Sequence, residues 1–248
     1  MPRFFIPTGA VGIRDDKSKT VMISGDDASH ITRSLRMKVG ETIECCDMSR
    51  REYICTITEV GETVFADVKE ERESDTEPPY RATLYQALAK GDKFDTIVQK
   101  AVECGVTRIV PVQTDRCVVR LDKKGASKKV ERWQRIALEA AKQCGRGIIP
   151  EVSDLLTFKE AVAEAAKADV PLFCYEAEKG TTLPEELNGA AKDSSISIFI
   201  GSEGGFSISE AEYAVMEGLK SVGLGKRILR CETASSFVLA CITYALEL

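Results

Sequence analysis

The chain has 248 residues, of which 44% are hydrophobic and 29% charged, and this length accommodates one large domain or two small ones. No apolar run approaches the roughly 18 residues of a membrane span, and the first seven residues lack the pattern of a signal peptide, so we expect a cytoplasmic protein without a membrane partner. Nine cysteines without a C-x-x-C pair favour reduced thiols, and a single histidine, His30, excludes a multi-histidine metal centre.

The first seventy residues predict a small β-rich domain. Its expected strands are Thr20–Ile23, Thr42–Asp47, Glu52–Thr58 and Thr63–Val68. Asp26 or Asp27 is expected to cap a short helix that carries His30, Arg33 and Arg36. The two arginines are three positions apart, so they would share one helix face, either as a phosphate clamp or as ordinary exposed side chains.

A polar segment, Lys69–Pro79, ends in two prolines and is typical of a linker, which places the domain boundary between residues 72 and 73. Beyond Tyr80 the pattern changes to alternating strands and helices. The expected strands are 82–89, 108–112, 172–175 and 196–200, and the expected helices follow Asp92 and Ser127 and end at Gly105 and Gly145. Residues 73–248 therefore predict an α/β domain with a mainly parallel sheet.

Two glycine-bearing turns follow near the end of the chain. The first comes after the strand that ends at Ile200, and Ser207 with Glu210 then forms a capping box for a helix through Leu219. The second turn spans residues 222–230. Such turns are either plain connections or places where the backbone approaches a ligand, and ligands gather at the carboxyl ends of parallel strands. The dinucleotide fingerprint G-x-G-x-x-G is absent, which argues against NAD.

The net charge of −5 argues mildly against a nucleic-acid partner, but the charge is unevenly distributed. Residues 116–146 contain ten basic and three acidic residues, a local charge of +7, and residues 1–14 contain Arg3 and Arg14 without an acid. The excess of one sign favours binding to a polyanion over a simple solvated helix face. The last segment, residues 234–248, is apolar on nearly all sides and has to be covered on all of them.

Seven spaced motifs carry a resemblance over nearly the whole chain. They are Pro2-Arg-Phe-Phe5, His30-x-x-Arg33-x-x-Arg36 with Gly40, Lys100-Ala-x-Glu103-x-Gly105-Val106, Arg132-Trp133, Glu139-Ala140-x-x-Gln143-x-x-Arg146, Ile200-Gly-x-Glu-Gly-Gly205 and Leu224-Gly-x-Arg227-Ile-Leu-Arg230-x-Glu-Thr-Ala234. In these motifs the chain resembles the bacterial 16S ribosomal RNA uridine-N3 methyltransferases of the SPOUT superfamily. Ser202 and Cys231 stand where that family usually has proline and threonine.

The resemblance implies a PUA-like RNA-binding β-barrel at the N-terminus and a SPOUT α/β domain with a deep trefoil knot. It also implies S-adenosylmethionine as the methyl donor, no metal, a homodimer, and 16S ribosomal RNA of the small subunit as substrate. The expected donor-binding residues are Ile200, Gly201, Gly204, Gly205, Leu224, Gly225, Ile228, Leu229 and Thr233. The expected RNA-binding residues are Arg3, Arg33, Arg36, Arg116 and Arg146.

Methylation of a neutral uridine requires loss of the N3 proton. Arg230 is the first candidate for a cation that stabilises the resulting anion. Glu203 and Glu232 are candidates for the proton acceptor or for orienting the arginine, and each is equally compatible with a surface cap or a salt bridge. His30 is expected to shape the N-terminal domain. Two alternatives stay open, a SPOUT enzyme acting elsewhere, for instance on a ribose 2′-hydroxyl, and a non-catalytic RNA-binding assembly protein.

Overall fold

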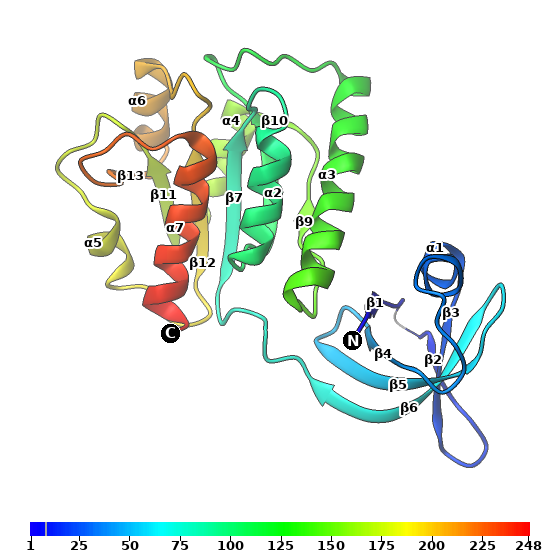
Figure 1. Cartoon of the computed structure of the whole chain (residues 1–248). Helices are drawn as coiled ribbons and strands as arrows, with labels where there is room; N and C mark the ends of the chain where they lie inside the picture. The colour runs from blue at the N-terminus through cyan, green and yellow to red at the C-terminus, as the bar shows by residue number, and fades with distance from the viewer. Residues whose placement is uncertain (8) are drawn as a thin grey trace. The chain divides into compact units, whose positions relative to one another are not determined.

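The computed structural model describes residues 1–7 and 9–248, which form two compact units. The first unit contains Met1–Glu77 together with Ala141–Ile149, and the second contains Pro78–Ala140 and Pro150–Leu248. Each unit has its own sheet and its own core (Figure 1). Helix α3, Lys123–Cys144, is shared, because its last turn belongs to the first unit.

The sheet of the first unit has the strand order β1-β4-β5-β6-β3-β2. The strands are β1 Arg3–Phe5, β2 Val11–Ile13, β3 Lys19–Ile23, β4 Thr42–Cys46, β5 Arg51–Glu59 and β6 Val64–Glu73. Only the β1–β4 pair is parallel among the described strand pairs of this sheet; the others are antiparallel. Alternate residues of β5 are buried, as expected for a strand with one face on a core.

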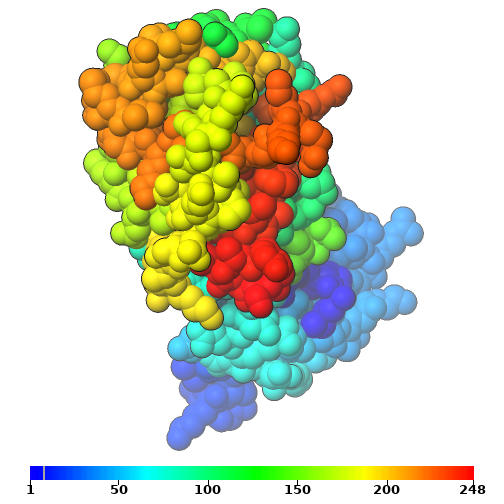
Figure 2. All heavy atoms as spheres, turned by 90° about the vertical axis from the view of Figure 1, so that its left-hand side faces the viewer, coloured from blue at the N-terminus to red at the C-terminus, as the bar shows by residue number. Residues whose placement is uncertain are grey.

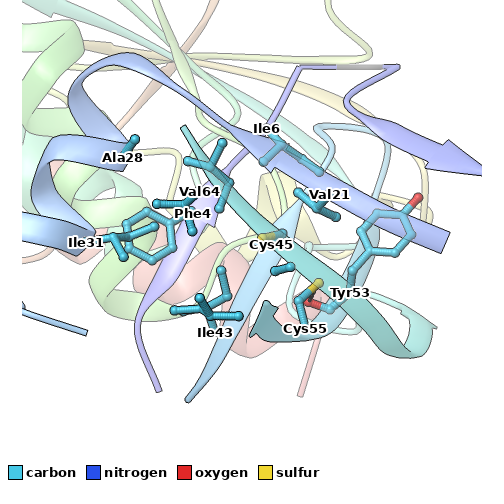
Figure 3. Packing of buried hydrophobic residues seen from close by; sticks show 13 residues of the cluster. Phe4, Ile6, Val21, Ala28, Ile31, Ile43, Cys45, Tyr53, Cys55 and Val64 are labelled. Atoms are coloured by element: carbon cyan, nitrogen blue, oxygen red, sulfur yellow. Dashed lines mark hydrogen bonds between the residues drawn. The ribbon is translucent and has the colours of Figure 1, made fainter. Parts of the chain in front are cut away.

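The core of the first unit is formed by side chains from the strands and from two short helical turns, α1 Gly25–Ser29 and the π-helix η1 His30–Ser34. Figure 3 shows Phe4 from β1 packed beside Ile31 from η1, with Ile43 and Cys45 of β4 nearby. His30 meets the Phe4 ring edge to face, with a centroid distance of 6.3 Å. This contact is consistent with a structural part for His30.

The sheet of the second unit is parallel throughout, with the order β10-β8-β7-β12-β11-β13, and β9 also pairs with β8. The strands are β7 Arg81–Ala87, β8 Arg108–Gln113, β9 Glu151–Val152, β10 Leu156–Thr157, β11 Val170–Cys174, β12 Ser195–Ile200 and β13 Lys220–Val222. All five residues of β11 are buried, and so are five of the six in β12. Continuous burial is expected because helices cover both faces of a parallel sheet.

Helices α4, Phe158–Ala165, and α6, Ile208–Met216, pack on one face over a cluster that includes Phe173, Phe199 and Phe206. Helices α2, Lys93–Glu103, and α7, Cys231–Leu246, lie side by side on the other face (Figure 1). A short helix, α5 Leu183–Leu187, lies in the connection between β11 and β12. The sequence-based α/β class with a parallel sheet is confirmed.

Three expectations for the first unit are wrong. Asp26 and Asp27 do not cap the first short helix, because they lie inside α1 and Ser24 stands at its N-cap. The polar segment from Lys69 to Glu73 belongs to β6, because its charges pair with those of β5 across the ladder: Arg51 lies opposite Glu73, and Glu52 lies opposite Arg72. Arg33 and Arg36 do not share a helix face. The π-helix ends at Ser34, and Arg36 follows it in a left-handed conformation with φ of 53°.

Several helix ends also differ from expectation. Helix α3 begins at Lys123 rather than after Ser127, α6 ends at Met216, and α7 begins at Cys231. Asp92 stands at the N-cap of α2 but makes no side-chain capping bond. The capping box of Ser207 and Glu210 is confirmed, and Gly105 and Gly145 follow their helices with the positive φ of a C′ glycine.

Candidate active site

A cavity of ≈ 900 Å³ opens at the carboxyl ends of β11, β12 and β13 in the second unit. Its walls are the segments that follow these three strands and the start of α7. Figure 2 shows the face on which the yellow segment near residue 180 and the orange-red segment near residues 225–230 reach the surface; both belong to the cavity wall. The cavity therefore lies where parallel α/β sheets bind their ligands.

The first glycine turn forms one wall. A Cβ atom added at Gly201 would lie 3.1 Å from the Gly205 Cα atom, and one added at Gly204 would lie 3.1 Å from the Cβ atom of Arg116. Gly205 has φ of 63°, and a side chain there would meet the Glu176 carboxylate. Only glycine fits this close approach of backbone segments without displacing a neighbour.

Two buried polar side chains, Gln86 and Glu210, hold the first glycine turn and the segment that follows it by hydrogen bonds. The amide of Gln86, at the end of β7, donates from Nε2 to the Gly201 carbonyl at 3.3 Å. Glu210 is 5% exposed, and its carboxylate accepts from the Ser207 amide at 2.8 Å and from the Asp115 amide at 2.8 Å. These bonds join the loop after β8 to the start of α6, so the turn is fixed from three strands.

The second glycine turn forms another part of the wall. The Gly223 amide donates to the Thr181 carbonyl at 3.0 Å, which ties this turn to the segment after β11. Gly225 has φ of 100°, and nothing lies within 4 Å of a Cβ atom built there. Arg230 then caps α7, and its carbonyl accepts from the amides of Thr233 and Ala234.

The structure brings most of the expected donor-binding residues together. The cavity wall includes Ile200, Gly201, Gly204, Gly205, Leu224, Gly225, Ile228 and Leu229. Thr233, by contrast, lies in the first turn of α7. Among the residues that the structure describes, it is not one of those that line the cavity. Ile228 is 87% exposed, so it stands at the rim rather than inside. Their role in binding stays a prediction.

A charged cluster lies beside the first turn. Glu203 lines the cavity, and its Oε1 atom accepts from the Lys93 Nζ atom at 2.8 Å and from the Lys90 amide at 3.1 Å. Burial alone would raise the pKa of the Glu203 carboxyl, but the Lys93 ammonium and the backbone amides hold the pKa below its usual range. The same hydrogen bond raises the pKa of Lys93. Glu203 is therefore ionised and held in place.

Glu232 belongs to the same cluster. Its Oε2 atom accepts from the Cys231 thiol at 3.2 Å. Burial alone would raise the pKa of Glu232, but its backbone amide, the Cys231 thiol and the charges of Lys93 and Arg230 lower the pKa. Burial and the Glu232 carboxylate raise the pKa of the Cys231 thiol to about 12. Of the three catalytic candidates, Glu203 lines the cavity, whereas Arg230 and Glu232, at the start of α7, are not among its lining residues as the structure describes them. The role of all three in catalysis stays a prediction.

The five expected RNA-binding arginines divide into two groups. Arg33, Arg36 and Arg116 are exposed, and the Arg116 guanidinium donates to the Gly204 carbonyl at 3.0 Å. Arg3 and Arg146 instead have interior side chains, 8% and 4% exposed. Arg3 pairs with Glu44 and Glu52, and Arg146 pairs with Glu77. The contact of Arg3 and Arg146 with RNA stays a prediction. In the structure, both guanidinium groups are paired with carboxylates of the protein itself.

Two parts of the site escaped the sequence analysis. Lys93 has no motif of its own, and only its contact with Glu203, 110 positions away, reveals it. The segment from Tyr175 to Thr182 supplies a whole wall of the cavity. A signal for it existed, because this segment follows a buried strand of the same parallel sheet, just as the two glycine turns do.

In the described part of the chain, residues 1–7 and 9–248, no group of three or more His, Cys, Asp or Glu side chains is placed to hold a metal ion. The helices there are also too short or too polar to cross a bilayer.

The glycine-walled cavity lies in the parallel α/β unit, and the chain also contains a small β-rich unit. The chain belongs to the RNA methyltransferase family, because the RNA methyltransferase domain model matches residues 76–243 and the RNA methyltransferase PUA domain model matches residues 23–67. The family expected from the sequence motifs is thus confirmed.

Individual relatives match over the full length. Ribosomal RNA small subunit methyltransferase E from Bacillus subtilis is 35% identical, and the match covers 100% of this chain and 98% of the relative. The crystal structure of ribosomal RNA small subunit methyltransferase E from Neisseria gonorrhoeae, bound to S-adenosyl methionine, is 31% identical with a TM-score of 0.84 over 98% of this chain and 97% of that chain. A methyltransferase from Legionella pneumophila with bound SAM has 30% identity and a TM-score of 0.85 over 99% and 98% of the two chains.

Proposed function

We propose that this protein is an S-adenosylmethionine-dependent methyltransferase that modifies N3 of a uridine in 16S ribosomal RNA of the small ribosomal subunit, in the cytoplasm. The observation that carries the proposal is the glycine-walled cavity in a chain of this family. Full-length relatives named ribosomal RNA small subunit methyltransferase E, one of them bound to the donor, support it.

The residues of the cavity fit this donor. Ile200, Leu224 and Leu229 offer apolar surface for a flat adenine ring, and the glycine turns expose backbone groups that can bond its edge. Side chains at Gly201, Gly204 or Gly205 would push against neighbouring atoms of the wall, so their absence shapes the cavity. The acidic side chains Glu176 and Glu203 also suit a donor with a positive sulfonium centre.

When bound, S-adenosylmethionine supplies an activated methyl group on its sulfonium sulfur. The protein then has to orient the base, accept the N3 proton and stabilise the anion that its loss creates. Arg230, an exposed cation at the N-cap of α7, stabilises this anion. Glu203 and Glu232, whose carboxyl groups both have a lowered pKa, accept the proton or orient the arginine.

Two measurements separate this function from the alternatives. Calorimetric titration with S-adenosylmethionine should show one donor per chain, and a chain that binds none would be the non-catalytic RNA-binding protein instead. Nucleosides from ribosomal RNA treated with enzyme and donor should contain a methyluridine with the methyl on the base. A methyl found on the ribose would identify a 2′-hydroxyl methyltransferase of the same superfamily.

We also propose the finer fold features implied by the family resemblance. The two glycine turns would lie in a deep trefoil knot, and the first unit, Met1–Glu77 with Ala141–Ile149, would be a PUA-like barrel. The placement of β12 between β7 and β11, and the match of residues 23–67 to the PUA domain model, support these features.

We expect RNA binding to weaken with added salt, because Arg33, Arg36 and Arg116 are exposed cations available to phosphates. Arg33→Ala with Arg36→Ala should flatten the slope of log affinity against log salt by roughly 0.7 to 0.9 for each phosphate that is no longer bound. Lys192→Ala, an exposed lysine of the second unit, should leave the slope unchanged. A slope near zero in the unaltered protein would contradict this RNA footprint.

We further propose a homodimer formed through α7. One side of this helix is buried in the subunit, with Val238, Leu239 and Ile242 inaccessible, whereas Phe237 and Tyr244 are 41% and 77% exposed. A two-fold contact would cover these exposed apolar residues with the same surface of a second copy. The helix is apolar on nearly all sides, and its own subunit covers only one of them, so an apolar face stays exposed.

Phe237→Glu with Tyr244→Glu should convert the dimer to a monomer and abolish methyl transfer, because the pair places charge in an apolar interface. Light scattering at micromolar concentration measures the mass. Met216→Glu, an equally apolar position that is 73% exposed on α6, serves as the matched control and should stay dimeric. A monomeric unaltered protein with full activity would overturn the dimer.

A further inference from the structure

The two candidate carboxylates, Glu203 and Glu232, differ in the groups that already bind them, and of these two described residues only Glu203 lines the cavity. Glu203 accepts two strong hydrogen bonds on one oxygen atom, from the Lys93 ammonium at 2.8 Å and from the Lys90 amide at 3.1 Å. Glu232, within the described residues, accepts a side-chain bond from the Cys231 thiol at 3.2 Å, and a thiol is a weak donor. The lone pairs of Glu232 are therefore more available than those of Glu203.

Lys93 is the residue that creates this difference. It is the first residue of α2, and its side chain is 36% exposed while that of Glu203 is 30% exposed. Its ammonium bonds Glu203 on the first glycine turn and acts through its charge on Glu232 in the first turn of α7. The Lys93 ammonium thus joins α2 to the glycine turn by a hydrogen bond, and its charge alone reaches Glu232 on α7.

We propose that Lys93 is a positioning residue for methyl transfer: it commits Glu203 to holding the cavity wall and leaves Glu232, beside Arg230, as the acceptor of the substrate proton. This inference rests on the proposed function. In the step, the N3–H bond breaks and its proton goes to the Glu232 carboxylate. The electron pair left on N3 forms the bond to the methyl group, and the donor sulfur keeps the electrons of the bond that breaks and becomes a neutral thioether.

The first test is a double-mutant cycle in donor affinity, measured by calorimetry with S-adenosylmethionine. Lys93→Met and Glu203→Gln should each weaken donor binding by roughly two- to fivefold, which is the range for a partly exposed ion pair. The double variant should be no weaker than either single one, because both changes break the same contact. Lys100→Met, the same substitution on α2 at a lysine that pairs with Glu103, should not change donor affinity.

The second test is the pH dependence of kcat for methyl transfer. The groups that face this cluster are Lys93 from α2, Glu203 from the turn, and Arg230, Cys231 and Glu232 from α7. Loss of the Lys93 charge raises the pKa of Glu232, so the required carboxylate is protonated at a higher pH. The acid limb should therefore move to higher pH in Lys93→Met and return with Lys93→Arg, which restores the charge.

The assignment of Glu232, rather than Glu203, as the proton acceptor is tested by replacing each carboxylate separately. Glu232→Gln should lower kcat strongly while donor affinity stays near that of the unaltered protein, and Glu203→Gln should act mainly on donor affinity. The inference is overturned if the two effects in the cycle add, if the acid limb does not move, or if Glu203→Gln costs more kcat than Glu232→Gln. An unaltered protein that binds no donor, or that methylates no RNA, would instead refute the proposed function.

Discussion

Replacing Gly201 by valine is expected to weaken S-adenosylmethionine binding by roughly tenfold or more while the fold is retained. A Cβ atom at this position would lie 3.1 Å from the Gly205 Cα atom, 3.2 Å from the Gly205 carbonyl carbon and 3.2 Å from the Phe206 ring. These neighbours are backbone and a fully buried aromatic ring, so they cannot move aside cheaply. The turn would have to open and deform the cavity wall.

Calorimetry on the folded variant measures the effect, and circular dichroism verifies the fold. Gly189→Val, in a turn where nothing lies within 4 Å of an added Cβ atom, is the matched control and should bind the donor normally. Gly225→Val should also weaken binding, but for a different reason: the space there is open, and a backbone with φ of 100° disfavours valine. Unchanged donor affinity in both Gly201→Val and Gly225→Val would contradict the assignment of the donor site to these turns.

Glu77→Ala is expected to destabilise the protein by about 3 to 5 kcal/mol, the cost of breaking a buried ion pair from one side. The Glu77 and Arg146 side chains are 2% and 4% exposed, with Nη2 of the arginine 2.6 Å from Oε2 of the glutamate. The other carboxylate oxygen accepts from the amides of Gly147 and Ile148. One carboxylate thereby joins the segment Ala141–Ile149 to the rest of the first unit.

Urea unfolding gives this free energy, with Asp75→Ala as an exposed neighbouring control that should stay within about 0.5 kcal/mol. A destabilisation below about 1 kcal/mol for Glu77→Ala would contradict the buried-pair interpretation. The result also bears on RNA binding: an Arg146→Ala variant with weaker RNA affinity has to be checked for unfolding before the effect is assigned to a phosphate contact.

The sequence was sufficient for the features that local pattern determines. The buried strands of the second unit are continuous apolar runs, and Ile196–Ile200 lies within β12 as expected. Gly105 and Gly145 marked helix ends, and Ser207 with Glu210 marked a helix start, because each of these depends on neighbours within a few positions. The two glycine turns were found as strand ends, and in the structure residues of both turns line one cavity.

Features that depend on distant contacts could not be predicted. The charges of Lys69–Glu73 look like a linker until β5 is seen beside them. Arg3 looks like a free cation until Glu44 and Glu52, more than 40 positions away, are placed against it. Lys93 becomes visible only when α2 meets the glycine turn. Ion pairs between distant segments leave no periodic pattern in the sequence. Arg3 and Arg146 were therefore expected on an RNA-binding surface, although both pair with glutamates inside the protein.

The most direct measurement follows a labelled methyl group from S-adenosylmethionine into 16S ribosomal RNA, either free or within small subunits, with the unaltered protein and Gly201→Val in parallel. The label is expected in a single uridine, on N3 of the base, with the unaltered protein, and close to background with the variant. Label on a ribose, label in a protein fraction, no label at all, or equal labelling by the two proteins would contradict the assignment of this cavity as the site of uridine-N3 methylation.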